Sequence, residues 1–529
     1  MGTSTPSGVF VAVAWAKGRT EMQAGRRRFT RREVLGLGLL GAAAFALPLE
    51  RSARTKFGDQ LEKLPPPFGA ELPIPKPLPP TRASATTDFY NITMKKGTAS
   101  IIPGLPTPIW GYNGQFPGPM ISARKGRRVS MTVTNDLPEN TALHMHGAYV
   151  DGDSDGYPED KMPPGGAKTY VFPNRQNART QWFHDHVAHH TATNVYKGLA
   201  GLYLIGDEFE DNLPLPKGQF DVPLVVQDRL FHADGRFLYP FEADDHSTNG
   251  VEGDVILVNG KPWPKMTVAN RSYRLRILNG SNARVYGLAL SNGQPLTVIG
   301  SEGGLLERPV RVRSLPISPG ERYEVVVNFA GVPVGTGPES RVTLENLRAD
   351  EETTREIMRF DVARRASDDS TVPAVLRPAK DQIDDTHQPC VEADAVRTRT
   401  WVFKRTGGFW TVNGKIWDAR RVDARPREGD VEVWEFVNNG GGWIHPIHPH
   451  LVNFKILTRN GRPPHPWESG YKETVFLDGN DRVRVLIKFP KVPIEGTPGP
   501  YARKFPIHCH HIEHEDHDMM AQFEVSGAA

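Results

Sequence analysis

At 529 residues the chain is too long for one ordinary domain, and two to four domains are expected. Hydrophobic residues make up 38% and charged residues 24%, a composition typical of soluble globular proteins. The formal net charge of +3 comes from residues 1–46, which hold seven basic and two acidic side chains, so the rest of the chain carries about −2. That near-neutral balance argues against a nucleic-acid partner.

The N-terminal segment 1–46 is predicted to be a twin-arginine signal peptide. The pair Arg31-Arg32 stands in a sequence that resembles the twin-arginine export motif, an apolar run follows at 34–47, and residues 44–46 offer a small-residue cleavage site. The apolar run of about 14 residues is short for a membrane span, and an amphipathic or anchoring helix is the alternative.

We expect the twin-arginine export machinery to deliver the chain to the periplasm, the cell surface or the medium. No other segment is apolar enough to cross a bilayer, so no stable membrane span is predicted. Met1 and Met22 are both candidate start residues.

The remainder of the chain repeats itself three times. Asn-Gly pairs at 113, 259 and 413 lie 146 and 154 residues apart, and each is a turn signal between strands. Each pair is followed by a stretch of period-2 alternation, at 128–135, 273–279 and 431–438, whereas long helical patterns are nearly absent. The fold class predicted from this pattern is all-β, with three related Greek-key sandwich or barrel domains.

Composition gives approximate domain limits. Residues 47–85 are proline-rich and predict an extended arm, while 209–221 and 365–392 are polar and predict connectors. The three predicted domains are residues 86–208, 222–364 and 393–529.

Histidine placement indicates the chemistry. Ten of the 18 histidines fall into four clusters, two in the first repeat and two in the third. They are His144 and His146; His184 and His186; His445, His448 and His450; and His508, His510 and His514. The second repeat has no histidine near the matching position, Tyr286. We therefore expect the outer repeats to bind metal together and the middle one to be a spacer.

The spacing has a physical meaning if these segments are strands. Residues i and i+2 point to one face and i+1 to the other, so each His-x-His motif presents two imidazoles to one side. In the sequence His508-Cys509-His510 the two histidines face one metal site and Cys509 faces another. A thiolate, two imidazoles and a distant thioether form a blue-copper site, and Cys509, His445, His514 and Met519 supply that set. A disulfide between Cys509 and Cys390 is therefore disfavoured, and the role of Cys390 stays open.

Together the four clusters resemble the signature of three-domain multicopper oxidases, over about residues 70–525. Residues 445–454 and 508–520 look closest to bacterial spore-coat laccases and bilirubin oxidases. The resemblance implies three cupredoxin domains, the middle one without copper, and four copper ions per chain. It implies a type 1 (blue) copper on His445, Cys509, His514 and axially Met519; a type 2 copper on His144 and His448; and a coupled type 3 pair, one ion on His146, His184 and His510, the other on His186, His450 and His508. Met520 could compete as the axial ligand.

Two carboxylates complete the expected site. Residues 151–156 imitate the start of an EF-hand loop, but its twelfth position is Met162, so a calcium site is rejected. The resemblance instead places Asp155 near the type 2 copper and Glu515 near the copper pair. Reduction of dioxygen to water consumes protons, which such catalytic carboxylates would relay. Ordinary turn carboxylates are the alternative.

The resemblance implies a laccase-like enzyme that couples four one-electron oxidations of a phenolic or aminophenolic reductant to the reduction of dioxygen to water, and we expect it to be a monomer. Electrons would enter where His514 or His445 approaches the surface. A metallo-oxidase acting on Mn(II), Cu(I) or Fe(II) is the alternative, although the 11 methionines form no cluster beyond Met519-Met520. A copper-free structural relative is a third hypothesis, which the complete ligand set disfavours. His189, His190, His511 and His517 are given no metal role.

Overall fold

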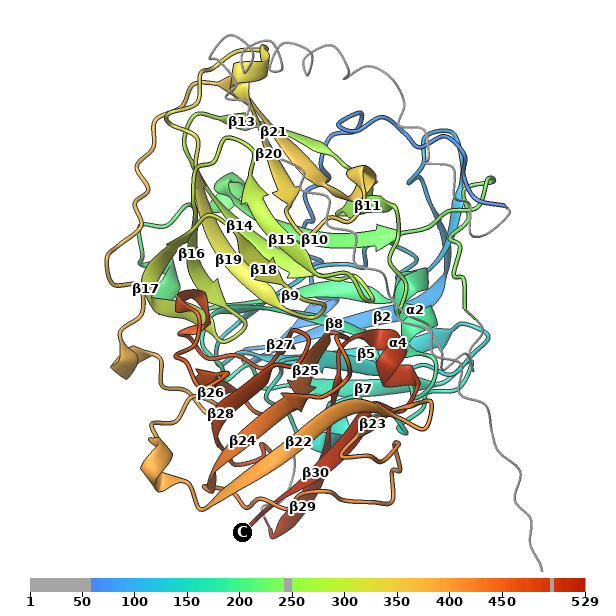
Figure 1. Cartoon of the computed structure of the whole chain (residues 1–529), viewed down its shortest axis with the longest axis vertical. Helices are drawn as coiled ribbons and strands as arrows, with labels where there is room; N and C mark the ends of the chain where they lie inside the picture. Colours follow the sequence, from blue (N-terminus) through green and yellow to red (C-terminus); the bar gives the residue numbers. More distant parts are fainter. Residues whose placement is uncertain (1–58, 242–249, 495–498, 529) are drawn as a thin grey trace, which may run out of the picture. The chain divides into compact units, whose positions relative to one another are not determined.

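A computed structural model describes residues 59–241, 250–494 and 499–528 (Figure 1). The predicted signal peptide lies outside the described residues. Six sheets, in three sequence-local pairs, make up the described fold, with only short helices between them. The prediction of an all-β chain of Greek-key cupredoxin domains is confirmed. The limits assigned to the three domains stay a prediction.

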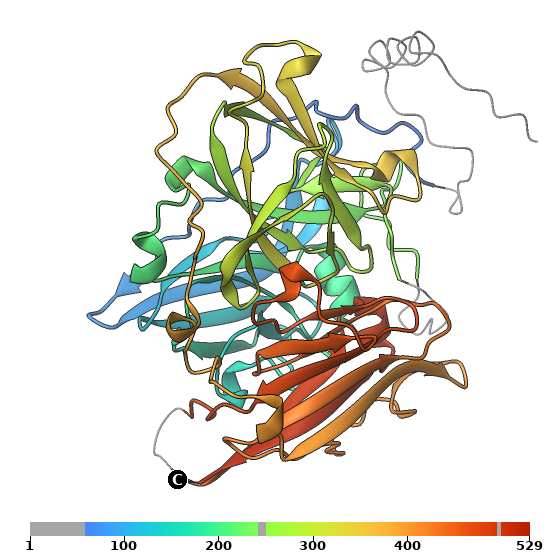
Figure 2. The same ribbon diagram turned by 60° about the vertical axis from the view of Figure 1, so that its left-hand side comes forward.

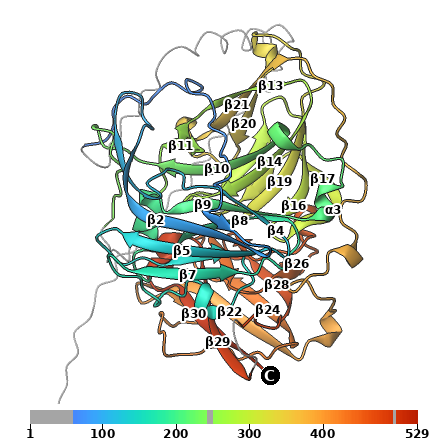
Figure 3. The same ribbon diagram turned by 180° about the vertical axis from the view of Figure 1, so that it is seen from behind.

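The first pair of sheets carries the first two histidine clusters. Its strands are β1 (Arg82–Ala83), β2 (Thr87–Ala99), β3 (Thr107–Tyr112), β5 (Arg128–Asp136) and β7 (Ala167–Phe172) in one sheet, and β4 (Ile121–Arg124), β9 (Ala200–Gly206), β8 (Arg179–Asp185) and β6 (Leu143–His146) in the other. In β5 every second residue is buried, as the alternating sequence predicts for a strand with one face on the core. Seen from behind, β2, β5 and β7 face the viewer (Figure 3).

The middle pair of sheets contains a large apolar core. One sheet consists of β12 (Lys261–Pro262), β11 (Val255–Val258), β10 (Asp221–Arg229), β14 (Ser272–Asn279), β19 (Arg322–Asn328), β16 (Leu296–Ser301) and β17 (Gly304–Val312); the other of β13 (Lys265–Ala269), β21 (Glu356–Arg364), β20 (Arg341–Asn346), β15 (Tyr286–Leu290) and β18 (Leu315–Ile317). Leu61, Leu64 and Phe68, from the predicted N-terminal arm, are buried in the same core. The arm therefore adds apolar surface to the middle sheets.

The third pair carries the remaining clusters. Its sheets are β23 (Phe409–Val412), β22 (Arg397–Thr406), β24 (Val431–Asn438), β28 (Arg482–Lys488) and β26 (Phe454–Arg459), and β27 (Val475–Leu477), β25 (His445–Pro449), β29 (Tyr501–Cys509) and β30 (Met520–Gly527). The connector 365–392 runs along the outside of the molecule between β21 and β22 (Figure 2).

The three Asn-Gly pairs are turns, as predicted. Asn113, Asn259 and Asn413 have φ of 56°, 49° and 54°, and the glycine after each also has positive φ. Two successive left-handed residues are what a type I′ turn between twisted strands requires.

Three short α-helices lie among the described residues: α2 (Thr191–Lys197), α3 (Glu208–Asp211) and α4 (Ile512–Asp516). The Asp516 carboxylate accepts hydrogen bonds from the backbone amides of Thr191 and Ala192, and so joins α4 to the start of α2. No helix in the described part of the chain is both long and apolar enough to cross a membrane. Cys390 and Cys509 form no disulfide, as expected.

Candidate metal centres

Strand pairing brings the four histidine clusters together. β6 and β8 run antiparallel with His144 opposite His184, and β25 and β29 run antiparallel with His448 opposite His508. Eight imidazoles, buried at 1% exposure or less, meet between the first and third pairs of sheets; we call them the eight-histidine cluster. They are His144, His146, His184, His186, His448, His450, His508 and His510.

Three groups of ligand atoms within this cluster could each hold a metal ion. In each group the atoms lie within 4.8 Å of one another. The groups are His144, His146 and His448; His146, His184 and His510; and His186, His450 and His508. In the last, the Nε2 atoms of His186 and His450 lie 3.3 and 3.2 Å from Nε2 of His508. Converging nitrogens of this kind require a cation between them or a shared proton.

Backbone carbonyls select which ring nitrogen is free. Nδ1 of His144 donates to the Asp155 carbonyl at 2.6 Å, Nδ1 of His184 to the Asp185 carbonyl at 2.7 Å, and Nδ1 of His448 to the Glu473 carbonyl at 2.9 Å. The Nε2 atoms of these three histidines are buried without a hydrogen-bond partner in the described structure. Buried polar atoms are normally paired, and a carbonyl on one nitrogen that leaves the other for a metal is the usual arrangement of histidine ligands.

Burial keeps the imidazoles in the form that binds metal. Desolvation lowers the pKa of His184 to about 3 and that of His186 to about 4, and it lowers the pKa of His144 and His448 well below the usual value. These rings are therefore neutral at physiological pH, with a lone pair available. The residues fit metal ions.

A second cluster, the cysteine-centred cluster, comprises His445, Cys509 and His514. The Cys509 Sγ lies 3.4 Å from Nδ1 of His445 and 3.8 Å from Nδ1 of His514, and the two nitrogens are 3.3 Å apart. Cys509 thus belongs to a different cluster from its neighbours His508 and His510, as alternation along a strand predicts. Burial raises the pKa of the Cys509 thiol, so a bound cation is needed to hold the thiolate.

Met519 adjoins the cysteine-centred cluster through its backbone. Its amide donates to the His514 carbonyl at 2.9 Å, and its carbonyl accepts from the Cys509 amide at 3.1 Å. Its side chain is fully buried in the same apolar cluster as Cys509. Met520 instead lies opposite His508 in the pairing of β29 with β30.

From the sequence, His514 or His445 is expected to approach the surface, but neither imidazole does. His445 and His514 both have 0% exposure. The His514 ring is sandwiched between Trp410, at 3.7 Å between centroids, and His511, at 3.8 Å and nearly parallel. Trp443, which is partly exposed, packs edge-on against Trp410. Sequence reasoning missed Trp410, because it lies about a hundred residues from His514 and in no motif.

Asp155 and Glu515 both contact imidazoles of the eight-histidine cluster. The Asp155 carboxylate accepts from Nδ1 of His450 at 2.8 Å, and Glu515 pairs with Nδ1 of His508 at 2.9 Å. Burial raises the pKa of Asp155 to about 8. Burial also raises that of Glu515, but His508 and His186 outweigh it and bring the pKa to about 2. Metal ions on these imidazoles would lower both values, since a nearby positive charge favours the carboxylate.

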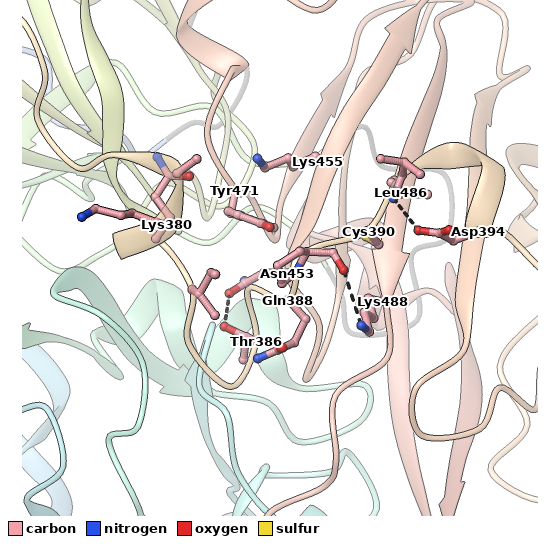
Figure 4. A pocket seen from close by; sticks show the side chains of 15 residues that line it. Lys380, Thr386, Gln388, Cys390, Asp394, Asn453, Lys455, Tyr471, Leu486 and Lys488 are labelled. Atoms are coloured by element: carbon pink, nitrogen blue, oxygen red, sulfur yellow. Dashed lines mark hydrogen bonds between the residues drawn. The ribbon is translucent and has the colours of Figure 1, made fainter.

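A cavity of about 520 Å³ lies between the connector 365–392 and strands β26 and β28 (Figure 4). Lys455, Tyr471, Lys488 and the half-buried Cys390 line it. The side-chain amide nitrogen of Asn453, in the wall of the cavity, lies 3.5 Å from the carboxylate of Glu473. Sequence reasoning did not identify Glu473 as a site residue. The cavity holds none of the predicted ligands.

The fold and the two clusters define the class of protein: an oxidase built of cupredoxin domains, in which one strand contributes residues to both clusters. The chain belongs to the multicopper oxidase family. Family models described as multicopper oxidase match residues 93–209, 217–336 and 391–528. Copper is therefore the metal that the family implies, and the chain is an oxidoreductase of laccase type with oxygen as acceptor.

Similar proteins include a bilirubin oxidase from Albifimbria verrucaria, 37% identical over 87% of this chain and 82% of that protein. A laccase from Bacillus stratosphericus is 33% identical over 87% of this chain and 99% of its own length. The cell division protein FtsP of Escherichia coli is 31% identical over 87% of this chain and 92% of its own. The crystal structure of a laccase from Pediococcus acidilactici superimposes with a TM-score of 0.77 at 33% identity, covering 88% of this chain and 95% of that one.

Proposed function

We propose that this oxidase takes electrons one at a time from phenolic or aminophenolic substrates and binds four copper ions. The type 1 copper is assigned to His445, Cys509, His514 and Met519, and the type 2 copper to His144 and His448. The type 3 pair is assigned to His146, His184 and His510 for one ion and His186, His450 and His508 for the other. The observation that carries this assignment is the alternation at 508–510, at the end of β29, which directs one thiol and two imidazoles of three consecutive residues into two separate clusters.

Copper supplies, when bound, the one-electron chemistry and the reduction of dioxygen to water. The chain itself contributes to electron transfer by connecting the two clusters. The backbone bonds from Cys509 to its two neighbours form a short covalent path between the clusters, and burial of every ligand excludes water from it. Little rearrangement of solvent then accompanies each transfer.

Electron entry is proposed at the Trp410 side of His514. Because Trp410 covers that imidazole and is itself fully buried, a donor contacts the partly exposed indole of Trp443, which packs against Trp410, rather than the ligand itself. Aromatic donors suit such a surface, since they can stack on an indole face. This supports phenols and aminophenols over metal ions.

Asp155 and Glu515 are proposed to move protons. Each is buried, bonded to the Nδ1 of a predicted ligand, and so lies one imidazole away from the place where dioxygen would be reduced. Reduction of one dioxygen to water requires four protons, and a buried carboxyl group beside the cluster is placed to relay them.

The metallo-oxidase hypothesis and the copper-free hypothesis are both testable on one preparation. Copper content and blue colour of the purified chain separate an oxidase from a copper-free relative. Turnover of a dimethoxyphenol, bilirubin and Mn²⁺, measured side by side, then separates the donors. We expect four copper ions per chain and the highest kcat/KM on the phenol; preferred oxidation of Mn²⁺ would contradict the proposal.

We also propose that the chain is exported by the twin-arginine route and acts as a monomer. The Arg31-Arg32 motif and the apolar run after it support export. This route carries folded proteins, which suits a chain whose buried sites are closed once it has folded.

A further inference from the structure

The middle pair of sheets, which supplies no predicted ligand, nevertheless touches the eight-histidine cluster. Gly320 lies in the turn between β18 and β19 (Figure 1). A Cβ on Gly320 would stand 3.0 Å from the ring of His510 and 3.1 Å from that of His146, and its φ of +82° is itself unfavourable for other residues. Only a glycine lets this turn pack so closely on two imidazoles.

Arg322, two residues further on, extends from the same turn to the third pair of sheets. Its guanidinium is fully buried and pairs with the carboxylate of Glu473. Nε of Arg322 donates to the Thr180 carbonyl at 3.0 Å, and Nη1 donates to the Gly320 carbonyl at 2.9 Å. All three sequence repeats therefore meet at one guanidinium, whose planar fork is fixed from several directions.

Glu473 contacts two of the predicted ligands by different atoms. Its carboxylate Oε1 lies 3.3 Å from Nε2 of His146, and its backbone carbonyl accepts from Nδ1 of His448 at 2.9 Å. The hydroxyl of Thr474 is 3.1 Å from the same Nε2 of His146. With that nitrogen occupied, Nδ1 of His146 is the one left, buried without a partner in the described structure.

The glycine of the first histidine motif makes room for this carboxylate. A Cβ on Gly147 would stand 2.2 Å from Glu473 Oε2, well inside any allowed contact. The sequence His146-Gly147 thus accommodates Glu473 directly beside a ligand.

We infer that the Arg322–Glu473 ion pair is a positioning element of the copper sites that His146 and His448 serve. Glu473 holds the His146 ring with Nδ1 toward the metal and, by its carbonyl, holds His448 with Nε2 toward the metal; Arg322 keeps the carboxylate in place. Such groups behind ligands affect metal affinity by about 10- to 100-fold. The middle domain is then a part of the copper site rather than a spacer. The inference rests on the proposed assignment of ligands.

The test is Glu473→Gln, which keeps size and hydrogen-bonding capacity but removes the charge that pairs with Arg322. We expect copper at the eight-histidine cluster to be lost about 10- to 100-fold more readily in dialysis against a chelator, with a changed EPR spectrum of the type 2 copper. The blue absorption should be kept, because neither Glu473 nor Arg322 contacts the cysteine-centred cluster among the described residues. Wild-type copper retention and an unchanged EPR spectrum would overturn the inference.

Glu302→Gln is the matched control. Glu302 is an equally buried carboxylate, paired at 2.8 Å with Lys472, the residue before Glu473, and it meets no imidazole of the cluster in the described structure. Breaking this pair disturbs the same interface, so equal loss of type 2 copper in this variant would reduce the effect to general destabilisation and overturn the inference. If Glu473→Gln does not fold, Thr474→Val is the deciding variant, since it removes the hydroxyl at His146 while keeping the volume. A smaller loss of copper from the eight-histidine cluster is expected, and unchanged copper retention would count against the inference.

A double variant tests the part played by Arg322. If Arg322 acts through Glu473, then Arg322→Met with Glu473→Gln should lose no more copper than Glu473→Gln alone. Additive losses would show that Arg322 acts independently. A wild-type chain that binds no copper and is not blue would instead reject the proposed function, whatever the variants do.

Discussion

At the scale of single residues, Cys509 is the side chain on which we expect electron entry to depend. Its sulfur is the one thiolate that could join the imidazoles of His445 and His514, at 3.4 and 3.8 Å. Cys509→Ser should abolish the blue absorption, which needs a copper–thiolate bond, and eliminate oxidase activity. Visible absorption and phenol oxidation are the measurements. Near wild-type turnover would mean that electrons bypass Cys509.

Met519 should act on the potential of the blue copper rather than on its presence. Removal of a weak thioether donor favours the reduced ion, so Met519→Leu should raise the potential. Met520→Leu is the matched control, because Met520 lies opposite His508 on β30. Redox titration of the blue band measures both variants. A shift in the control and none in Met519→Leu would assign the axial position to Met520.

Glu515 is expected to deliver protons, whereas the histidines that it contacts are expected to bind copper. Glu515→Gln keeps shape and hydrogen-bonding capacity but cannot release a proton. Substrate should reduce the blue copper at the normal rate, while reoxidation by dioxygen slows by about 10²-fold, roughly what a positioned acid contributes. Asp155→Asn should act in the same way, more weakly. Stopped-flow reoxidation with copper analysis on the same sample tests this, and unchanged reoxidation in both variants would make the two acids structural.

At the scale of elements, the helix α3 is joined to strand β14 by buried charges. Glu210 of α3 pairs with Arg274 and Arg276 at 3.0 and 2.9 Å. Burial raises the pKa of Glu210, but the two guanidiniums outweigh it and lower the pKa from 4.5 to about 2. Its carboxylate therefore contributes stability that is fully present above about pH 4.5 and is lost as the pH falls towards 2.

Glu210→Gln should accordingly be destabilising at neutral pH, by less than the roughly 3–5 kcal/mol that loss of a sole buried partner costs, since Asp221 and Glu324 still pair with both guanidiniums. The difference in Tm between the variant and the wild type should shrink from about pH 6 to about pH 3, because the carboxyl of the unfolded wild-type chain becomes protonated below about pH 4.5 while that of the folded protein stays ionised until about pH 2. Thermal unfolding of both proteins across that range is the measurement. A difference that stays constant with pH would exclude a role for the charge of Glu210.

At the scale of the whole molecule, export tests the predicted signal peptide. Replacement of Arg31 and Arg32 by lysine keeps the charge and the apolar run but alters the paired arginines that the export motif requires. We expect the variant to accumulate in the cytoplasm, folded and able to bind copper. Fractionation with a copper assay on each fraction checks this, and unaltered export would point to another route.

Two kinds of sequence signal made much of the protein predictable: local strand and turn patterns, and the resemblance to a family. Period-2 alternation and Asn-Gly turns are local, since side-chain direction along a strand and positive φ depend on a few neighbouring residues. The all-β fold, the turns at 113, 259 and 413 and the separation of Cys509 from His508 and His510 follow from them. The ligand roles came from the family resemblance and stay a prediction, although the structure brings the predicted residues into groups that fit metal ions.

The tertiary structure alone decided which residues stand behind the ligands. Trp410 reaches His514 from β23, Glu473 reaches His146 from the segment before β27, and Arg322 reaches Glu473 from the middle sheets. Each contact joins residues far apart in the chain. A single glutamate, arginine or tryptophan outside any motif has no sequence pattern from which such a contact could be predicted. Strand alternation fixes the face on which a side chain lies, whereas packing between sheets fixes what that face meets. The sequence by itself therefore determined the strands and the clusters of histidine and cysteine side chains, while the burial of His514 and the part of the middle domain in the site depended on how the sheets pack.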